Sequence, residues 1–183
     1  MSDIKVLGIC GSLRMRSFNR MALRVEQELA PAGMKVDAAD ISAFPLYNED
    51  VRAQGFPPAV QTFRDQIAAA DALLFVTPEY NYSMSGVLKN AIDWASRPPN
   101  QPFDGKPVAM MGASGGVLGT ARAQYHLRQT CVFLNMFPVN KPEVMIPQAQ
   151  NKFDADGKLT DQPTRDFISA HLVAFKAWVL RMK

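Results

Sequence analysis

Short apolar segments alternate along this chain with longer segments of helical periodicity. Five of them predict strands: Ile4 to Cys10, Lys35 to Ile41, Ala72 to Thr77, Pro107 to Met111 and Val139 to Ile146. The segments between and after them predict helices, at 17–30, up to Ala70, at 85–96, up to Phe133 and at 161–183. Strands that alternate with helices form a parallel sheet joined by right-handed crossovers. We therefore expect an α/β fold, a doubly wound five-stranded parallel sheet in the order 2-1-3-4-5 with helices on both faces.

The size and composition of the chain fit one domain over residues 1–183. Of its 183 residues, 48% are hydrophobic and 20% are charged, and a domain of this length buries roughly 70% of its unfolded surface. The net charge of +3 comes from scattered basic residues, without the stripe that suits nucleic acid. No apolar segment is long enough to span a bilayer, and no signal peptide is recognisable. We expect a cytoplasmic protein with neither nucleic acid nor membrane as a partner.

The two cysteines indicate no disulfide framework. Cys10 ends the first predicted strand, Cys131 lies in a predicted helix, and neither has a C-x-x-C neighbour. We expect buried, reduced packing residues and no metal site. The alternative is a reactive thiol at Cys10.

The loop after the first strand, residues 11–19, gathers hydroxyl, amide and guanidinium groups in front of a helix. Ser12, Arg14, Ser17 and Asn19 stand where that helix leaves its first backbone N–H groups unpaired. The glycine spacing matches neither the G-x-G-x-x-G loop of dinucleotide folds nor a P-loop. The remaining interpretation is a loop that wraps a terminal phosphate monoester, as flavodoxin-like proteins do for FMN. The alternative is an ordinary turn with a helix cap.

Two further loops follow the third and fourth predicted strands. They read Pro78-Glu-Tyr-Asn-Tyr-Ser83 and Gly112-Ala-Ser-Gly-Gly116. Ligands of doubly wound sheets bind beyond the carboxyl ends of the strands, so all three loops belong at one edge. Asn81 and two tyrosines suit the polar edge and flat face of an aromatic ring, although each tyrosine alone could be a packing residue. An unpaired Glu79 would oppose an anionic reduced flavin, so we expect it to act through its backbone or an ion pair.

Three motifs carry a resemblance to a known family. They are Gly11-Ser-Leu-Arg-x-x-Ser-x-Asn19, the second loop running into Gly86-x-Leu-Lys-Asn-Ala-Ile-Asp-Trp94, and Arg122-Ala-Gln-x-x-Leu-Arg128. Over almost the whole chain they resemble the NAD(P)H-dependent FMN reductase family, especially its quinone and chromate reductase branch. The resemblance implies a flavodoxin-like fold, non-covalently bound FMN and NADH or NADPH as hydride donor. It also implies two-electron reduction of quinones, chromate or other oxyanions as further acceptors, and a homodimer or homotetramer.

The same resemblance implies a set of FMN-binding residues. The phosphate would meet Ser12, Arg14, Ser17 and Asn19, with Leu13 and Phe18 contributing backbone or packing. The ring would meet Pro78, Glu79, Tyr80, Asn81 and Tyr82 on one side and Ser114, Gly115 and Gly116 on the other. Two positions depart from the family pattern. Ser85 replaces a frequent proline and is expected to preserve the helix start, whereas Thr120 replaces a frequent glycine and is expected to alter the acceptor side.

Two features of the sequence point to subunit contacts. The helix from Val87 to Ala95 carries apolar residues on more faces than one sheet can cover, which predicts a partner helix. The family resemblance suggests a polar cluster of Arg122, Tyr125 and Glu143 between dimers. Simple solvation of those three side chains is the alternative.

The expected mechanism is ping-pong. A nicotinamide dinucleotide would stack on the exposed flavin face, pass hydride to N5 and leave before a quinone enters. No side chain is expected to act as catalytic acid or base, because His126 and His171 both lie in predicted helices. The alternatives are a flavodoxin-type electron carrier, a flavin-bound redox sensor, and an azo-dye or free-flavin reductase. The sequence leaves the choice between NADH and NADPH open.

Overall fold

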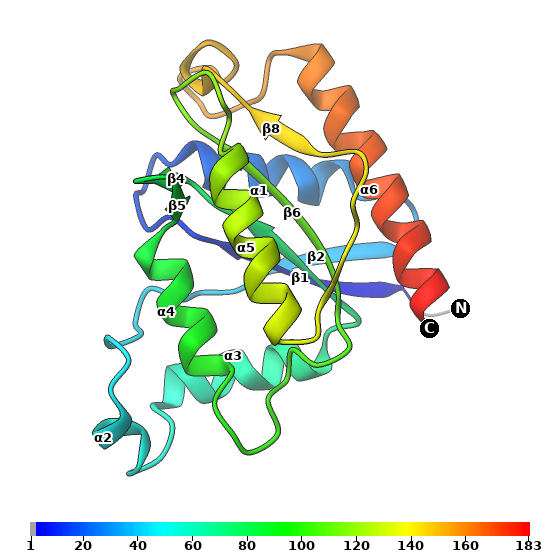
Figure 1. Ribbon diagram of the computed structural model, residues 1–183. Helices are drawn as coiled ribbons and strands as arrows, with labels where there is room; N and C mark the ends of the chain where they lie inside the picture. Colours follow the sequence, from blue (N-terminus) through cyan, green and yellow to red (C-terminus); the bar gives the residue numbers. More distant parts are fainter. Residues whose placement is uncertain (1–2) are drawn as a thin grey trace.

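The computed structural model describes residues 3–183 and contains a parallel sheet in the predicted order (Figure 1). Strands β2 (Met34–Ala38), β1 (Ile4–Cys10), β3 (Ala72–Val76) and β6 (Pro107–Ala113) lie side by side. The expected fifth strand consists of two pieces, β7 (Phe137–Pro138) and β8 (Val144–Ile146), which pair with opposite ends of β6. Pro138 and Pro142 lie in or between these pieces, and proline has no N–H for the strand ladder, so a continuous strand over 139–146 does not form.

Helices cover both faces of the sheet, as predicted. Helices α1 (Phe18–Leu29) and α6 (Gln162–Met182) pack on one face with Ile4 and Val6 of β1. Helices α3 (Pro58–Ala69), α4 (Gly86–Ala95) and α5 (Ala121–Phe133) pack on the other with Leu7 and Ile9. The side chains of β3 are all buried, because this central strand contributes to both cores.

Side-chain caps start three of the helices where the sequence places hydroxyl or carboxyl groups. Ser17 Oγ accepts a hydrogen bond from Asn19 N at 3.2 Å in α1, and Ser85 Oγ accepts one from Leu88 N at 3.2 Å in α4. Ser85 therefore preserves the helix start, as expected. Four short elements were not expected, namely α2 (Glu49–Arg52), the hairpin strands β4 (Glu79–Tyr80) and β5 (Ser83–Met84), and a 3-10 turn at Ala149–Asn151.

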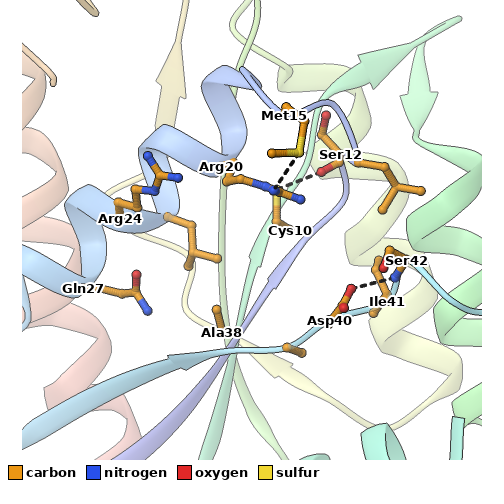
Figure 2. Close-up of a pocket in the computed structure, with 13 residues that line it drawn as sticks. Cys10, Ser12, Met15, Arg20, Arg24, Gln27, Ala38, Asp40, Ile41 and Ser42 are labelled. Carbon is orange, nitrogen blue, oxygen red and sulfur yellow. Dashed lines mark hydrogen bonds between the residues drawn. The ribbon is translucent and has the colours of Figure 1, made fainter. Parts of the chain in front are cut away.

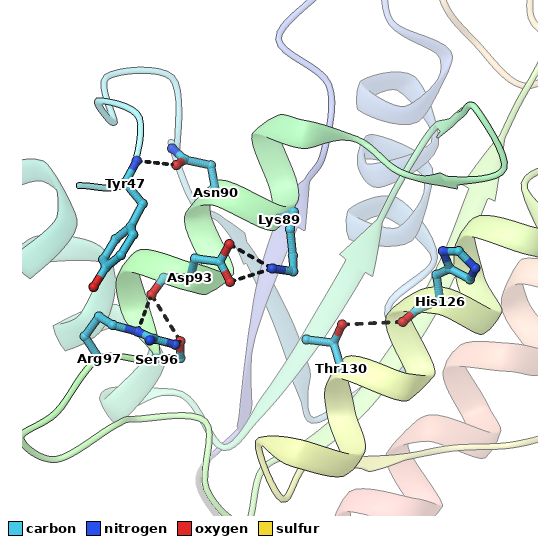
Figure 3. A network of polar contacts seen from close by, with 8 residues as sticks. All are labelled: Tyr47, Lys89, Asn90, Asp93, Ser96, Arg97, His126 and Thr130. Atoms are coloured by element: carbon cyan, nitrogen blue, oxygen red, sulfur yellow. Dashed lines mark hydrogen bonds and ion pairs between the residues drawn. The ribbon is translucent and has the colours of Figure 1, made fainter. Parts of the chain in front are cut away.

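The apolar faces of α4 are covered by this chain itself, so the argument from α4 to a partner helix is wrong. Trp94 is fully buried, its indole Nε1 donates to the Pro45 carbonyl at 2.8 Å, and the Tyr47 ring packs edge-on with centroids 4.9 Å apart. Asn90 accepts from Tyr47 N at 2.8 Å (Figure 3). It also donates to the same Pro45 carbonyl. The apolar loop 42–47 thus supplies the cover, an association between distant segments that helix periodicity alone does not reveal.

Both cysteines are free thiols, in different surroundings. Cys131 is fully buried, and burial raises the pKa of its thiol to about 12. Cys10 is only half-buried, which corrects the prediction of two buried residues, and burial also raises the pKa of its thiol. Along residues 3–183 the helices lack the length and apolar character that a membrane crossing requires.

Candidate functional site

The three loops that follow β1, β3 and β6 enclose one cavity at the carboxyl edge of the sheet. Its volume is about 290 Å³, and it is open on one side. The lining residues come from all three loops and are Ser12, Arg14, Ser17, Phe18, Asn19, Pro78, Glu79, Tyr80, Ala113, Ser114 and Gly115. Of the residues expected to bind FMN, Leu13, Asn81, Tyr82 and Gly116 lie outside this lining, whereas Ala113 lines it without having been expected.

The β1 loop presents the cavity with a polar, positively charged wall. Ser12 and Ser17 are buried, and the exposed Arg14 places its guanidinium 5.5 Å from the centre of the Phe18 ring. Phe18 in turn stacks on Phe153, with centroids 5.8 Å apart. The first turn of α1 opens at this wall, where backbone N–H groups lack helical partners. An anionic group is the ligand that this wall favours.

Asn19 uses its side chain as a link between α1 and β6. Its Nδ2 donates to the Ala113 carbonyl and its Oδ1 accepts from Ala113 N, both at 2.9 Å, and the residue is 3% exposed. This two-sided bond satisfies buried backbone groups at the end of β6. Only the second Nδ2 hydrogen is left for a ligand, so the expected role of Asn19 as a phosphate ligand competes with a structural one.

The β3 loop forms a tight hairpin that an ion pair holds against α5. Glu79 Oε1 accepts from Arg122 Nε at 2.5 Å and pairs with Nη2, while Oε2 accepts from the backbone N–H groups of Arg122 and Ala123 at 3.0 and 3.3 Å. The carboxylate therefore caps the N-terminus of α5, where negative charge is favourable. Of the two alternatives expected for Glu79, the ion pair is present in the structure.

The turn of this hairpin has an unusual backbone. Asn81 and Tyr82 both adopt left-handed conformations, with φ of 51° and 66°. Tyr80 and Tyr82 are 55% and 65% exposed. Arg122 lies over the Tyr82 ring at 3.5 Å from its centre, so one guanidinium contacts both Glu79 in β4 and Tyr82 in the turn. A hairpin with exposed aromatic rings at the mouth of a cavity can cover one face of a flat ligand.

The polar cluster expected around Arg122 is arranged differently. Arg122 pairs with Glu79 rather than with Glu143. Glu143 lies 3.4 Å from the Tyr125 hydroxyl and 3.9 Å from Arg128 Nη2. Sequence analysis missed the Glu79–Arg122 pair because the two residues are 43 positions apart and belong to separate motifs.

Gly112 and Gly119, on either side of the third loop's tip, serve backbone packing. A Cβ at Gly112 would lie 2.2 Å from the Thr77 carbonyl, and a Cβ at Gly119, whose φ is +54°, would lie 2.7 Å from Ile146 N. Thr120 also has a positive φ, of 75°, which explains why glycine would suit this position. Its buried hydroxyl accepts from Gln124 at 3.2 Å and does not line the cavity, contrary to the expected effect on the acceptor side.

The two histidines lie away from the cavity lining, as the sequence indicated. His126 is exposed on α5, with Nδ1 3.1 Å from Ser83 Oγ (Figure 3 shows its ring above the helix). His171 is buried on α6, with Nδ1 2.8 Å from the Pro142 carbonyl, and burial lowers its pKa. Among residues 3–183 there is also no cluster of three or more potential metal ligands.

A second, larger cavity lies behind the β1 loop and was not expected from the sequence. It measures about 540 Å³ and lies between α1, the β1 loop and the end of β2 (Figure 2). Its polar lining includes Ser12, Arg20, Arg24, Gln27, Asp40 and Ser42. The signal available in the sequence was the spacing of residues 20, 24 and 27, which share one helix face.

A doubly wound sheet with an anion-binding loop and a ring-sized cleft at its carboxyl edge defines a class, the flavodoxin-like nucleotide-binding proteins. The family model for NADPH-dependent FMN reductases matches residues 4–151. The chain therefore belongs to the NADPH-dependent FMN reductase family.

Individual relatives agree with this assignment. An NAD(P)H-dependent FMN reductase of Pseudomonas aeruginosa is 66% identical over 181 residues, covering 99% of this chain and 98% of the relative. A quinone reductase of Escherichia coli is 49% identical over 183 residues, covering 98% and 97%. Among solved structures, the flavoenzyme NAD(P)H:(acceptor) oxidoreductase FerB from Paracoccus denitrificans superimposes with a TM-score of 0.89 at 38% identity, covering 98% of both chains.

The cavity has the chemistry that FMN needs. Its β1-loop side offers two hydroxyls, one guanidinium and a helix N-terminus for a dianionic phosphate. Its far side offers Pro78, the Tyr80 ring and the Ala113–Gly115 backbone for a flat ring system. The only carboxylate in the lining, Glu79, is neutralised by Arg122 and so does not repel an anionic ligand. The residues present therefore fit the group.

Proposed function

We propose that this chain, as one domain, is an FMN-dependent NAD(P)H oxidoreductase that reduces quinones by two electrons in a ping-pong reaction. The observation that carries the proposal is the single cavity in which the β1, β3 and β6 loops meet. Family membership and relatives named as quinone reductases support the substrate class. The chemistry that bound FMN supplies is reversible hydride and electron transfer.

The three loops would divide the work of holding the cofactor. Ser12, Arg14, Ser17 and the first turn of α1 would bind the phosphate, with Leu13 and Phe18 shaping the loop. Four or five charged hydrogen bonds at roughly 1.5 to 3 kcal/mol each are enough for micromolar binding, which requires about 8 kcal/mol. The hairpin at 78–82 and the loop at 114–116 would flank the ring, with Asn81, Tyr82 and Gly116 forming its outer rim.

The open side of this cavity supports the proposed ping-pong order. One exposed ring face offers room for one flat partner at a time, so donor and acceptor would use it in turn. Tyr80 and Tyr82, both exposed at this mouth, would stack on whichever partner is present. No side chain of the lining is required as an acid or base, because neither histidine reaches it.

Two measurements test this function. Under anaerobic conditions, NADH or NADPH should abolish the absorbance of the FMN-loaded protein at about 450 nm, which is typical of oxidised flavins. A small quinone should then restore this absorbance. Initial rates at several quinone concentrations should give parallel double-reciprocal lines. Intersecting lines would contradict the ping-pong order, and no bleaching by either nicotinamide would contradict the oxidoreductase itself.

Other acceptors and roles are separated by the same assays. Chromate and other oxyanions would be reduced more slowly than quinones, because the cavity mouth offers aromatic rings rather than a second cationic pocket. An azo dye or free flavin would replace the quinone if competition kinetics favoured it. Reduction only through a partner protein would instead indicate a flavodoxin-type carrier.

We also propose a homodimer or homotetramer in the cytoplasm. Two large apolar side chains follow the cavity-lining residues Ser114 and Gly115 along the chain, with Val117 74% and Leu118 47% exposed. Such a patch is typical of a subunit contact. Two free thiols suit a reducing compartment. Light scattering of the purified protein gives its mass, and cell fractionation gives its location.

A further inference from the structure

The larger cavity shares a wall with the FMN cavity but is a separate space. Ser12 lines both cavities, whereas Leu13 and Met15 line only the larger one and Arg14 only the smaller. The β1 loop is therefore a partition, with side chains directed alternately to each side. At about 540 Å³, the larger cavity falls within the size range of small-molecule sites.

One face of α1 gives this cavity unneutralised positive charge. Arg20, Arg24 and Gln27 lie at positions i, i+4 and i+7 and line the same wall (Figure 2). Along residues 3–183, no carboxylate oxygen lies within 4.0 Å of a nitrogen of Arg20 or Arg24. The polar contact that Arg20 makes is a weak one, to Met15 Sδ at 4.0 Å. Guanidinium groups of this kind are available to an anionic ligand.

The opposite wall offers an ionised carboxylate. Asp40 follows β2, and its Oδ1 accepts from Ser42 N at 2.9 Å. Hydrogen bonds from Ser42 and the nearby charge of Arg20 lower the pKa of Asp40. The Asp40 side chain is exposed, and a carboxylate accepts readily from the hydroxyls of a sugar.

The combination of groups restricts the class of ligand. Two arginines favour a phosphate, but a bare inorganic anion would leave the Asp40 carboxylate facing negative charge. A ligand with a phosphate at one end and free hydroxyls beside it satisfies both walls. The small side chains of Ala38 and Ala39 line the floor between them and leave room for such a group.

We propose that this cavity is a second nucleotide site, which binds a phosphate-bearing ribose between Arg20 and Arg24 on one side and Asp40 on the other. The site lies at the carboxyl ends of β1 and β2, an edge where α/β sheets bind ligands. The phosphorylated ribose has two sources, namely the adenosine 2′-phosphate half of NADPH and a free adenine nucleotide. The inference goes beyond the proposed function and does not depend on where the flavin ring lies.

The test uses calorimetric titration of the FMN-loaded protein with 2′,5′-ADP, so that the FMN phosphate loop is already filled. We expect saturable binding that weakens at least tenfold in Arg20→Gln and Arg24→Gln. Asp40→Asn should lower the affinity for 2′,5′-ADP. The same substitution should leave the affinity for inorganic phosphate unchanged or raise it. The matched control is Arg16→Gln, which removes the same charge just before α1. Arg16 lies outside both cavities and donates to the Ala155 carbonyl at 2.8 Å.

Kinetics identify the source of the ribose. If the ligand is the donor itself, 2′,5′-ADP competes with NADPH, and Arg24→Gln raises KM for NADPH without changing KM for NADH. If the ligand is a free nucleotide, 2′,5′-ADP binds but changes neither the KM for NADPH nor the KM for NADH. The proposal is overturned if 2′,5′-ADP does not bind, or binds the arginine variants and the wild type equally. Bleaching by NADH in these variants shows separately whether the oxidoreductase function stands.

Discussion

The loops after β1 and β3 face the same cavity but are held in place by different kinds of interaction. The β1 loop is fixed by buried, neutral hydrogen bonds, from Ser85 Oγ to the Gly11 carbonyl at 2.5 Å and between Asn19 and Ala113. The β3 hairpin is fixed by the charges of Glu79 and Arg122, and its tyrosines remain exposed. A buried neutral bond is costly to break, whereas a part-exposed charged one contributes less. The comparison suggests a rigid phosphate side and an adjustable ring side.

The largest expected effect is at Asn19. Asn19→Ala would leave the buried Ala113 N–H and carbonyl without partners, and we expect a loss of about 2–4 kcal/mol in the free energy of unfolding. Urea denaturation of the apoprotein measures this loss. Asn151→Ala, at an exposed position, should change the free energy by less than about 0.5 kcal/mol. Unchanged stability together with lost FMN affinity would make Asn19 a phosphate ligand instead of a structural link.

Ser85 comes next. Its hydroxyl both caps α4 and donates to the β1 loop, and the residue is 1% exposed. Ser85→Ala should cost about 1–2 kcal/mol and weaken FMN binding by loosening Gly11. Ser169→Ala, on α6, is the control for removing a helical hydroxyl. Equal effects of the two substitutions would show that the bond to Gly11 is unimportant.

The charged side of the comparison is tested by a double-mutant cycle. Glu79→Gln and Arg122→Met should show a coupling energy of about 1 kcal/mol in urea unfolding, since Arg122 is half-exposed. The same cycle at the exposed pair Lys89 and Asp93, 2.7 Å apart on α4 (Figure 3), should give about 0.3–0.5 kcal/mol. Salt should reduce both couplings. If the coupling energy of Glu79 and Arg122 is as small as that of Lys89 and Asp93, the ion pair does not hold the hairpin in place.

The smallest expected effect concerns Cys10, behind the rigid loop. Because burial raises the pKa of its thiol, Cys10 is predominantly protonated at pH 7. Iodoacetamide should therefore label it slowly at pH 7 and faster as the pH rises toward that pKa. Cys10→Ala should keep quinone reduction within about twofold of the wild type. Rapid labelling at pH 7 with loss of activity would restore the reactive-thiol alternative.

The fold was predictable because its signals are local. Apolar runs, the cap at Ser17 and the turn after Ser96 mark the elements, and the rules for parallel sheets then bring three loops to one edge. Ser12, Arg14 and Tyr80 could be placed at the cavity for the same reason. The missing parts depend on pairings between distant segments. Asn19 bonds to Ala113, 94 positions away in the sequence, and Trp94 bonds to Pro45, 49 positions away. Neither pairing produces a periodic pattern in the sequence that could predict it.

The contact of Gly119 with the backbone of β8 has a practical consequence for redesigning the acceptor preference of this protein. Val117 and Leu118 are 74% and 47% exposed, so the folding of a single chain admits almost every amino acid there. One position further, any side chain would meet Ile146 N at 2.7 Å, and a saturation library should yield only glycine among folded clones. Tolerance to mutation thus changes from broad to nil within three consecutive codons.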